Sequence, residues 1–281
     1  MVQIMTDSAA DFEPWEYEKM NVKCIPLCVT IGNTEYQETV NITKDMFYQL
    51  VADCEDFPHT SQPSPYTVEC MLQDAMDAGD EAVVIALSSE LSGFCQNLFM
   101  VKTMMEYDGC YIIDSKNATG GNRLLVEHAV KLRDEGKSAC EIVAELESLR
   151  SKITLYACMD TLEYLHRGGR ISSTVYTVGS IAHIKPIITI NAEGGVDIPA
   201  KTMGMRKGME FLCKKVLQSV PDENYPFYVM YTADRTNGVL LAKKLAEYGY
   251  IIPDERIINV GAAIGSHVGP NACGLVYIQK E

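Results

Sequence analysis

The stretch AVVIALSSELSG, residues 82–93, decides the fold class of this chain. Its first half is an unbroken apolar run, without the alternation of polar and apolar residues that marks a strand exposed on one face. The second half is polar, ends in glycine and leads into an amphipathic segment at residues 91–105 that we predict to be a helix. A fully buried strand followed by a helix is the unit of a parallel sheet covered on both faces.

The same order of apolar run and amphipathic segment extends in both directions from this stretch. In the first half of the chain we predict strands at residues 2–6, 23–31 and 110–114 and helices at 44–52, 66–76, 120–134 and 138–150. In the second half we predict strands at 153–159, 185–190, 227–232, 256–261 and 274–279 and helices at 161–165, 174–181, 204–220 and 239–248. The sequence therefore predicts an α/β protein.

The middle of the chain carries the signal of an antiparallel hairpin. Residues 191–197 hold Gly194 and Gly195 between two short apolar runs, which is typical of a tight turn. The chain has 281 residues with 47% hydrophobic content, more than one average domain holds. We therefore predict an N-terminal α/β/α domain with a parallel sheet at residues 1–152 and a second α/β domain with a mixed sheet at residues 153–281.

Composition excludes several classes of function. The formal net charge is −14, and Lys and Arg are scattered, so a nucleic-acid partner or an anionic membrane surface is disfavoured. We find no run of about 18 apolar residues and no basic region followed by an apolar core at the start of the chain. We expect a cytoplasmic protein without stable membrane insertion.

The ten cysteines and two early aspartates give no metal site. The cysteines sit singly, mostly inside apolar runs, and no Cys-x-x-Cys pair occurs, which indicates buried free thiols. Cys24 and Cys28 lack a second ligand pair that would complete a zinc site. Asp7 and Asp11 follow the first predicted strand, where capping or turn roles are commoner than metal binding. We therefore predict no metal and no cofactor.

Three hydroxyl-bearing segments, at residues 60–65, 88–93 and 265–270, are candidates for binding an anion. A loop that leads from a strand into a helix presents free N–H groups and the positive end of the helix dipole to a carboxylate or phosphate. Ser92 lies at such a junction, and Gly93 lets a ligand approach the backbone closely.

The same hydroxyls have a plainer interpretation that the sequence leaves open. Thr60, Ser64 and Ser92 are residue types preferred as helix N-caps, so each could serve the backbone and not a ligand. A lone His in a glycine-rich loop, such as His267, is likewise more often a structural hydrogen-bonding residue.

The sequence Arg167-Gly168-Gly169-Arg170 also has two interpretations. Either glycine can end a helix in the left-handed conformation. Alternatively, Arg170 and Arg206 form a basic island that receives a partner protein or a phosphate, since guanidinium binds phosphate in two-point geometry. The segment does not match the spacing of a Walker loop, so we do not expect this chain to bind ATP.

Seven motifs, taken together and in order, resemble the DegV family. They span nearly the whole chain and are Asp7-Ser8-Ala9-Ala10-Asp11, Thr60-Ser61-Gln62-Pro63-Ser64, Ser88-Ser89-Glu90-Leu91-Ser92-Gly93, Asp114-Ser115, Leu162 to Ile171, Lys185-Pro186 and Gly265-Ser266-His267-Val268-Gly269-Pro270. The resemblance implies a two-domain α/β protein that binds a long-chain fatty acid, with the acyl chain buried and the carboxylate at the domain interface.

The resemblance also implies a partner and roles for particular residues. In bacteria with a fatty acid kinase, such proteins resemble the subunit that carries the fatty acid to a separate kinase, which phosphorylates its carboxylate with ATP. The chain itself would then be a noncovalent carrier, not an enzyme. Thr60, Ser61 and Ser92, with Gly93, are implied to contact the carboxylate, and His267 to donate a further bond or steer phosphoryl transfer.

The chain departs from the family pattern in ways that raise an alternative. Phe94 and Cys95 follow Ser92-Gly93 where a small hydroxyl residue is usual, and the last motif continues with Asn271 and Cys273. Phe94 could shorten the tunnel, cover the carboxylate or change the chain preference. Cys95 and His267 are also the residue types of a thiol hydrolase or acyltransferase, although no orienting acid is evident. Among the methionines, Met159, Met203 and Met205 are weak candidates for lining a lipid tunnel.

Overall fold

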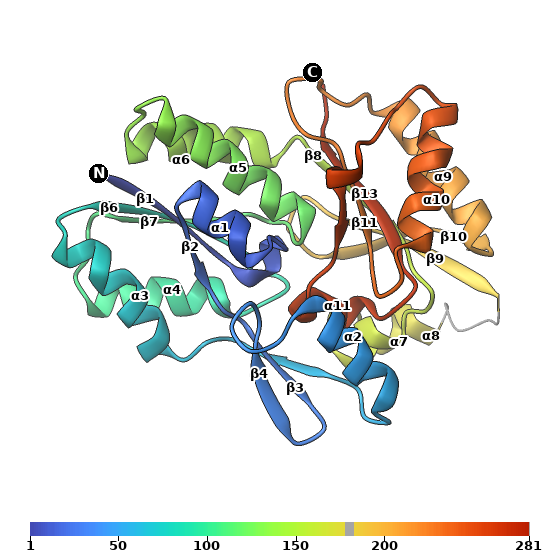
Figure 1. The fold of residues 1–281 in the computed structure, drawn as a ribbon, viewed down its shortest axis with the longest axis horizontal. Helices are drawn as coiled ribbons and strands as arrows, with labels where there is room; N and C mark the ends of the chain where they lie inside the picture. Colours follow the sequence, from blue (N-terminus) through green and yellow to red (C-terminus); the bar gives the residue numbers. More distant parts are fainter. Residues whose placement is uncertain (178–182, 281) are drawn as a thin grey trace.

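The computed structural model describes residues 1–177 and 183–280, whose strands form three sheets (Figure 1). The strands are β1 Val2–Asp7, β2 Val22–Ile25, β3 Cys28–Ile31, β4 Thr34–Gln37, β5 His59–Ser61, β6 Glu81–Ala86, β7 Cys110–Asp114, β8 Ile153–Cys158, β9 Ile184–Ile190, β10 Val196–Met203, β11 Tyr228–Tyr231, β12 Ile257–Asn259 and β13 Cys273–Ile278. The α-helices are α1 Pro14–Met20, α2 Lys44–Asp53, α3 Pro65–Asp77, α4 Phe94–Met104, α5 Gly120–Asp134, α6 Ala139–Arg150, α7 Glu163–Arg167, α8 Ser173–Thr177, α9 Met205–Gln218, α10 Thr236–Glu247 and α11 Ala262–Val268, and the short 3-10 helices are η1 Ser8–Ala10 and η2 Asp254–Arg256.

The first sheet has the order β2-β1-β6-β7, and every pair in it is parallel. Neighbouring residues of one strand enter different cores: Ile4 packs with α5 and α6, whereas Met5 packs with α3 and α4. The sheet is therefore buried on both faces. This confirms the parallel, helix-covered sheet that the apolar run at residues 82–87 predicts.

The second sheet is mixed, as the sequence predicts, with the order β10-β9-β8-β13-β11-β12. Its pairs are antiparallel except β11–β12. The predicted hairpin is present between β9 and β10, and its turn is closed by hydrogen bonds between Asn191 and Gly195. Helices α9 and α10 cover one face of this sheet, and α5 approaches the other (Figure 1).

The prediction of a single strand at residues 23–31 is wrong, because the segment is divided into β2 and β3, which belong to different sheets. Pro26 has no backbone N–H for a sheet ladder, and the strand ends at Ile25. β3 then begins at Cys28 and joins a separate three-stranded sheet, β4-β3-β5. This small sheet brings β5, with Thr60 and Ser61, to α11.

Some predicted helix boundaries also differ from the structure. The helix predicted from residue 91 begins at Phe94, because Leu91 and Ser92 donate to the Ser88 carbonyl in a turn. The helix predicted at 161–165 runs from Glu163 to Arg167. The helix predicted at 174–181 is described only to Thr177, and residues 178–182 lie outside the described residues.

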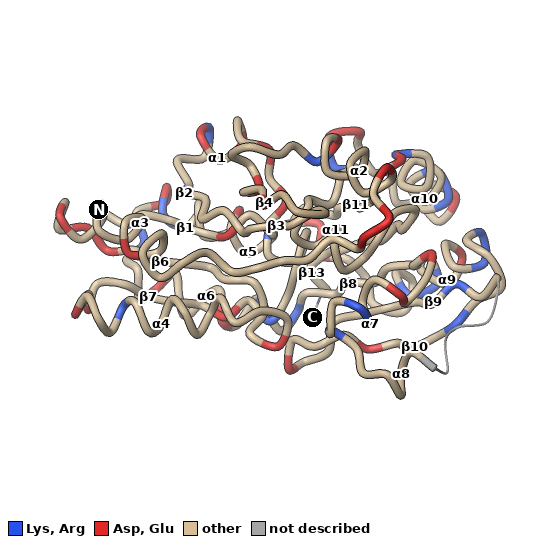
Figure 2. The backbone as a smooth tube through the Cα atoms, turned by 90° about the horizontal axis from the view of Figure 1, so that it is seen from below, with Lys and Arg blue, Asp and Glu red and all other residues tan. Residues whose placement is uncertain are grey.

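The two halves share one core. Helix α5 contacts β1 and β6 of the first sheet and β8 and β13 of the second (Figure 1). Leu124 of α5 and Ile142 of α6 therefore pack in the same cluster as Leu155 and Val276. Lys and Arg are interspersed with Asp and Glu over both halves (Figure 2). A cavity lies at the junction of the two halves, beside this shared core.

Candidate functional site

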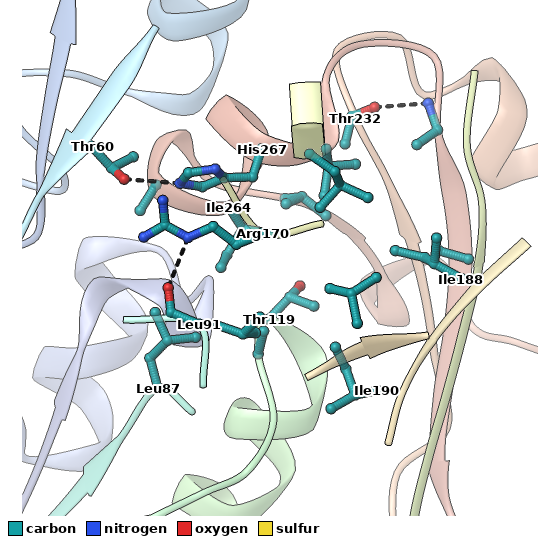
Figure 3. Close-up of a pocket in the computed structure, with 18 of the residues that line it drawn as sticks. Thr60, Leu87, Leu91, Thr119, Arg170, Ile188, Ile190, Thr232, Ile264 and His267 are labelled. Carbon is teal, nitrogen blue, oxygen red and sulfur yellow. Dashed lines mark hydrogen bonds between the residues drawn. The ribbon is translucent and has the colours of Figure 1, made fainter. Parts of the chain in front are cut away.

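A cavity lies between the two halves, with an empty volume of about 1150 Å³ including its open mouth. Thr60, Arg170, His267 and Leu91 lie at one side of it, and Ile188 and Ile190 lie at the other (Figure 3). The first half of the chain contributes Leu27, Thr60, Ser61, Gln62, Leu87, Leu91, Ser92, Gly93, Ala118 and Thr119 to its lining. The second half contributes Leu155, Ala157, Leu165, Arg170, Ile188, Ile190, Val196, Met230, Tyr231, Thr232, Val260, Ala263, Ile264, His267, Val268, Ala272, Cys273 and Gly274.

The apolar part of the cavity follows the pleat of the second sheet. Residues two apart on one strand share a face, so Leu155 with Ala157, and Ile188 with Ile190, line the same wall. Leu27 and Leu87 close the cavity from the first half. The result is an apolar surface of the kind that can bury a hydrocarbon chain.

The three methionines suggested by the sequence do not line this wall. Met159 is buried behind the wall, in a cluster with Leu165 and Ile188, but is not among the lining residues. Met203 is 60% exposed, and Met205 contacts the sulfur of Cys273. The methionine that lines the cavity is Met230, on β11. The apolar run around Met230 does not indicate in the sequence that this residue lines a cavity. The face of a strand that meets a cavity depends on how the strand pairs in the sheet.

The polar end of the cavity is built around a hydrogen bond between Thr60 and His267. The Thr60 hydroxyl lies 2.8 Å from Nε2 of His267 (Figure 3). Thr60 is held in β5 through its pairing with Val29, and His267 lies near the C-terminal end of α11. The residues at 265–270 were predicted to be a loop, but the structure places Gly265 to Val268 inside this helix.

The environment of His267 keeps its ring neutral. Burial lowers the pKa of His267 to about 3, and the positive charge of Arg170 and the ring of His59 act in the same direction. Its Nδ1 is buried and has no partner among the described residues. The ring packs against Gly168, where any larger residue would collide with Nδ1.

Ser92 combines the two roles that the sequence left open. Its hydroxyl accepts a hydrogen bond from the N–H of Phe94 at 3.2 Å, as at a turn entering a helix, and it also lines the cavity. Gly93 is the N-cap of α4 and lines the cavity beside Gln62. Ser64, by contrast, is an N-cap that accepts from the N–H of Thr67 and does not line the cavity.

Arg170 also combines a structural and a cavity-lining position. Its Nε donates to the Leu91 carbonyl at 2.9 Å, which joins the two halves beside the cavity, and its guanidinium also donates to the Gly168 carbonyl (Figure 3). Gly168 is the C-cap of α7, and Gly169 follows with a φ of 74°. Arg206 lies exposed in the first turn of α9 and is not among the lining residues, so the structure does not bring it to the cavity.

The residues that depart from the family pattern lie mostly outside the cavity. Phe94 is fully buried in the core of the first half and does not line the cavity, so it neither covers nor shortens it. Burial raises the pKa of Cys95 to about 11, which keeps the thiol protonated and unreactive. Cys273 does reach the cavity, whereas Asn271 does not.

Asp7 acts as the cap that the sequence predicts, since its carboxylate accepts from the N–H of Ala9 at the start of η1. Asp11 does more, because its carboxylate accepts from Thr119 and from Gly261 on the other half of the chain. Glu38, which the sequence gave no reason to single out, lies beside it. Over residues 1–177 and 183–280, no group of three or more His, Cys, Asp or Glu side chains is placed to hold a metal ion.

None of the helices described in residues 1–177 and 183–280 is both long and apolar enough to cross a membrane. The longest, α5, has 15 residues and carries charged side chains along its length.

Comparison with known proteins identifies similar chains along the full length. A family model described as an uncharacterised protein of the DegV family matches residues 1–280. A DegV domain-containing protein of Staphylococcus aureus is 30% identical over 277 residues, which cover 99% of this chain and 98% of the relative.

Two solved structures share the fold. One, described by the fatty acid binding of a DegV family protein from Thermus thermophilus, superposes with a TM-score of 0.89 at 27% identity over 99% of both chains. The other is a stearic-acid-binding protein from Eubacterium ventriosum, with a TM-score of 0.89 at 25% identity over 100% of this chain and 99% of that one.

Proposed function

The chain belongs to the DegV family, and on that premise we propose that it binds a long-chain fatty acid noncovalently and presents the carboxylate to a separate ATP-dependent fatty acid kinase. In this proposal the chain carries the lipid and has no turnover alone. Its two domains, residues 1–152 and 153–281, hold the lipid between them, and the protein works in the cytoplasm of a bacterium.

The observation that carries the proposal is one continuous cavity that joins an apolar interior to a cluster of neutral hydrogen-bond donors. Burying an acyl chain against Leu155, Ile188 and Ile190 contributes about 0.8 kcal/mol per methylene. A carboxylate at the polar end loses water and needs several hydrogen bonds in its place. The hydroxyls of Thr60, Ser61 and Ser92 and the backbone at Gly93, all lining that end, supply them.

A bound carboxylate selects one tautomer of His267. If the proton sits on Nε2, the ring donates to the Thr60 oxygen, and the Thr60 hydroxyl remains free to donate into the cavity. If the proton sits on Nδ1, the Thr60 hydroxyl donates its hydrogen bond to Nε2 of the ring. Thr60 then presents only oxygen lone pairs to the cavity, and these repel an anion. The fatty acid therefore favours the first tautomer, and His267 acts through Thr60.

Among the described residues that line the cavity, Arg170 supplies the one positively charged side chain. Its guanidinium balances the head-group charge through space while its hydrogen bonds serve Leu91 and Gly168. When a kinase adds a phosphoryl group, the same guanidinium lies where the new negative charge develops. Arg206, exposed on α9, belongs in this proposal to the surface that the kinase contacts.

The first experiment is mass spectrometry of the purified protein under native and then denaturing conditions. The proposal expects a fatty acid mass that is retained natively and lost on denaturation. An acyl mass that survives denaturation on Cys95 would support a thiol hydrolase or acyltransferase instead. A protein that carries no lipid and does not bind added palmitate would end the proposal.

A single hydroxyl can then be tested against a matched neighbour. Ser92→Ala should weaken palmitate binding about tenfold, because a buried carboxylate loses one charge-assisted hydrogen bond. Ser89→Ala is the control, since the Ser89 hydroxyl donates to Asp114 and does not line the cavity. Isothermal titration with palmitate measures both. Equal affinities for the two variants would remove Ser92 from the head-group site.

Presentation to a kinase needs a separate assay. The lipid-loaded protein with ATP alone should form no acyl phosphate, and addition of a fatty acid kinase from the same organism should produce one, trapped with hydroxylamine as the hydroxamate. Arg170→Gln should lower the yield more than it lowers palmitate affinity. Acyl phosphate formed without the kinase would contradict the carrier role.

A further inference from the structure

The N-terminal end of α11 is bound by two buried carboxylates from the other half of the chain. Asp11 accepts from the N–H of Gly261 at 2.8 Å, and Glu38 accepts from the N–H of Ala263 at 3.3 Å. Both carboxylates are buried, and α11 has no capping side chain of its own at Gly261. Since the first four N–H groups of a helix lack partners within it, these two bonds satisfy two of them from across the junction.

Asp11 binds a second wall of the cavity at the same time. Its other oxygen accepts from the hydroxyl of Thr119, the N-cap residue of α5, which lines the cavity (Figure 3). Thr119 has a φ of 50°, a conformation that a β-branched residue adopts only when its surroundings hold it there. One carboxylate thus links Thr119 on the first half to Gly261 on the second.

The approach at Gly261 is close enough to require glycine. A Cβ there would collide with Glu38 and would come within 2.8 Å of the Asp11 carboxylate. The residues that follow, Ala263 and Ile264, line the cavity, and His267 lies one helical turn further. Any shift of Gly261 away from Asp11 therefore moves the wall and the head-group residue together.

Other contacts surround this link without replacing it. The Tyr48 hydroxyl donates to the Val260 carbonyl at 2.9 Å, and Lys44 donates to the Asp11 backbone carbonyl at 2.7 Å. Arg123 donates to the same carbonyl. These bonds fix the position of residues 11 and 260, whereas the Asp11 side chain joins the two cavity walls directly.

We propose that Asp11, supported by Glu38, is a positioning residue that latches the two walls of the cavity, so that a bound fatty acid escapes faster once the Asp11–Gly261 bond is broken. The inference rests on the proposed function, because it concerns how that same cavity retains its ligand. The latch sets the rate at which the lipid leaves, and it does so without contacting the lipid.

The test compares the dissociation of cis-parinaric acid, a fluorescent long-chain fatty acid, from wild type and variants, with excess palmitate as the competitor. Asp11→Ala should release the probe about tenfold faster or more, since both bonds of the latch are lost. Asp11→Asn should restore near-wild-type release. Its amide oxygen can accept from Gly261, its amide N–H can donate to Thr119, and the Thr119 proton can turn to the sulfur of Met230, 3.4 Å away.

Tyr228→Phe is the matched control. Its hydroxyl also donates across the junction, to Glu127 on α5 at 2.6 Å, but Tyr228 does not line the cavity. The latch predicts unchanged probe release in this variant. Faster release from Tyr228→Phe equal to that from Asp11→Ala would mean that general weakening of the junction, and not the latch, controls escape.

A second pair of variants decides the matter if Asp11→Ala fails to fold. Thr119→Val removes the hydroxyl and makes the wall more apolar, which by itself favours lipid; faster release from it would therefore come from the lost bond to Asp11. Thr119→Ser keeps the bond and should release the probe like wild type. Equal release from both Thr119 variants would overturn the latch. If wild type does not bind cis-parinaric acid at all, the result contradicts the proposed function itself, and the latch is rejected with it.

Discussion

The two ends of helix α11 meet the first half of the chain through opposite chemistry. At the N-terminal end, the N–H groups of Gly261 and Ala263 bind the carboxylates of Asp11 and Glu38. At the C-terminal end, a neutral His267 binds the hydroxyl of Thr60 beside the cavity. The N-terminal end is therefore occupied by carboxylates of the protein itself. At the C-terminal end, the uncharged side chains of His267 and Thr60 line the cavity.

This difference shows where an anionic ligand can bind. The sequence suggested that helix N-termini would hold the head group, but the N-terminus of α11 is already occupied by protein carboxylates. The dipole of α11 is unfavourable to an anion at the His267 end. In the proposed function, the head group therefore depends on the hydroxyls, on the backbone at Gly93 and on the charge of Arg170, and most of the affinity comes from the buried acyl chain.

The largest effect on stability is expected from Gly261→Ala, which places a methyl group at the acidic end of α11, the N-terminal end that binds Asp11 and Glu38. The new methyl group collides with Glu38 and crowds Asp11, so we expect a loss of about 2–4 kcal/mol in the free energy of unfolding. Urea denaturation measures it. Gly195→Ala is the control, because the nearest atom to its new Cβ is 3.4 Å away. A tolerated Gly261→Ala would show that the acidic end is loosely packed.

The next largest effect, on lipid affinity, is expected at the neutral end of α11, where His267 binds Thr60. Thr60→Val removes the hydroxyl and leaves Nε2 of His267 without its partner, so palmitate affinity should fall about 10- to 100-fold. Thr103→Val, on the exposed side of α4, is the control. Isothermal titration measures affinity, and urea denaturation checks that both variants fold. A Thr60→Val protein with wild-type affinity would show that the head group does not bind at this end.

Much of the fold follows from local sequence. Continuous apolar runs identified the parallel sheet, and paired glycines identified the β9–β10 hairpin, because both signals act over a few residues. The prediction failed at residues 23–31, where a single proline allowed the chain to leave one sheet for another. It also failed at residues 265–268, whose glycine and serine suggest a loop but which tertiary packing holds in a helix.

The candidate site was less accessible to sequence reasoning. Local chemistry gave two interpretations for Thr60 and His267, and the family resemblance chose between them, because these residues are 207 apart in the chain. Asp11 and Glu38 bind residues 250 and 225 positions away. A local pattern can identify Asp11 as a turn residue, but it carries no information on a partner at the far end of the chain.

The smallest effect concerns the pH dependence of stability. It tests whether ionised carboxylates at the acidic end of α11 stabilise the fold. Burial, opposed by neighbouring hydrogen bonds, raises the pKa of Asp11 to about 6 and that of Glu38 to about 7, both above their unfolded values. The groups that face them are Asp7, whose pKa burial also raises to about 7, with Lys44, Arg123, Tyr17, Cys24 and Tyr48.

Because the folded state holds these protons more tightly than the unfolded state, the stability that they contribute is full below about pH 4 and is lost as pH rises through 6 to 7. Glu38→Gln keeps an acceptor for Ala263 and cannot ionise. We expect it to match wild type at pH 5 and to exceed it by about 1–3 kcal/mol at pH 8. Urea denaturation at both pH values measures this. A variant that instead loses stability relative to wild type as pH rises would show that the charge of Glu38 on the α11 dipole outweighs the cost of burying it.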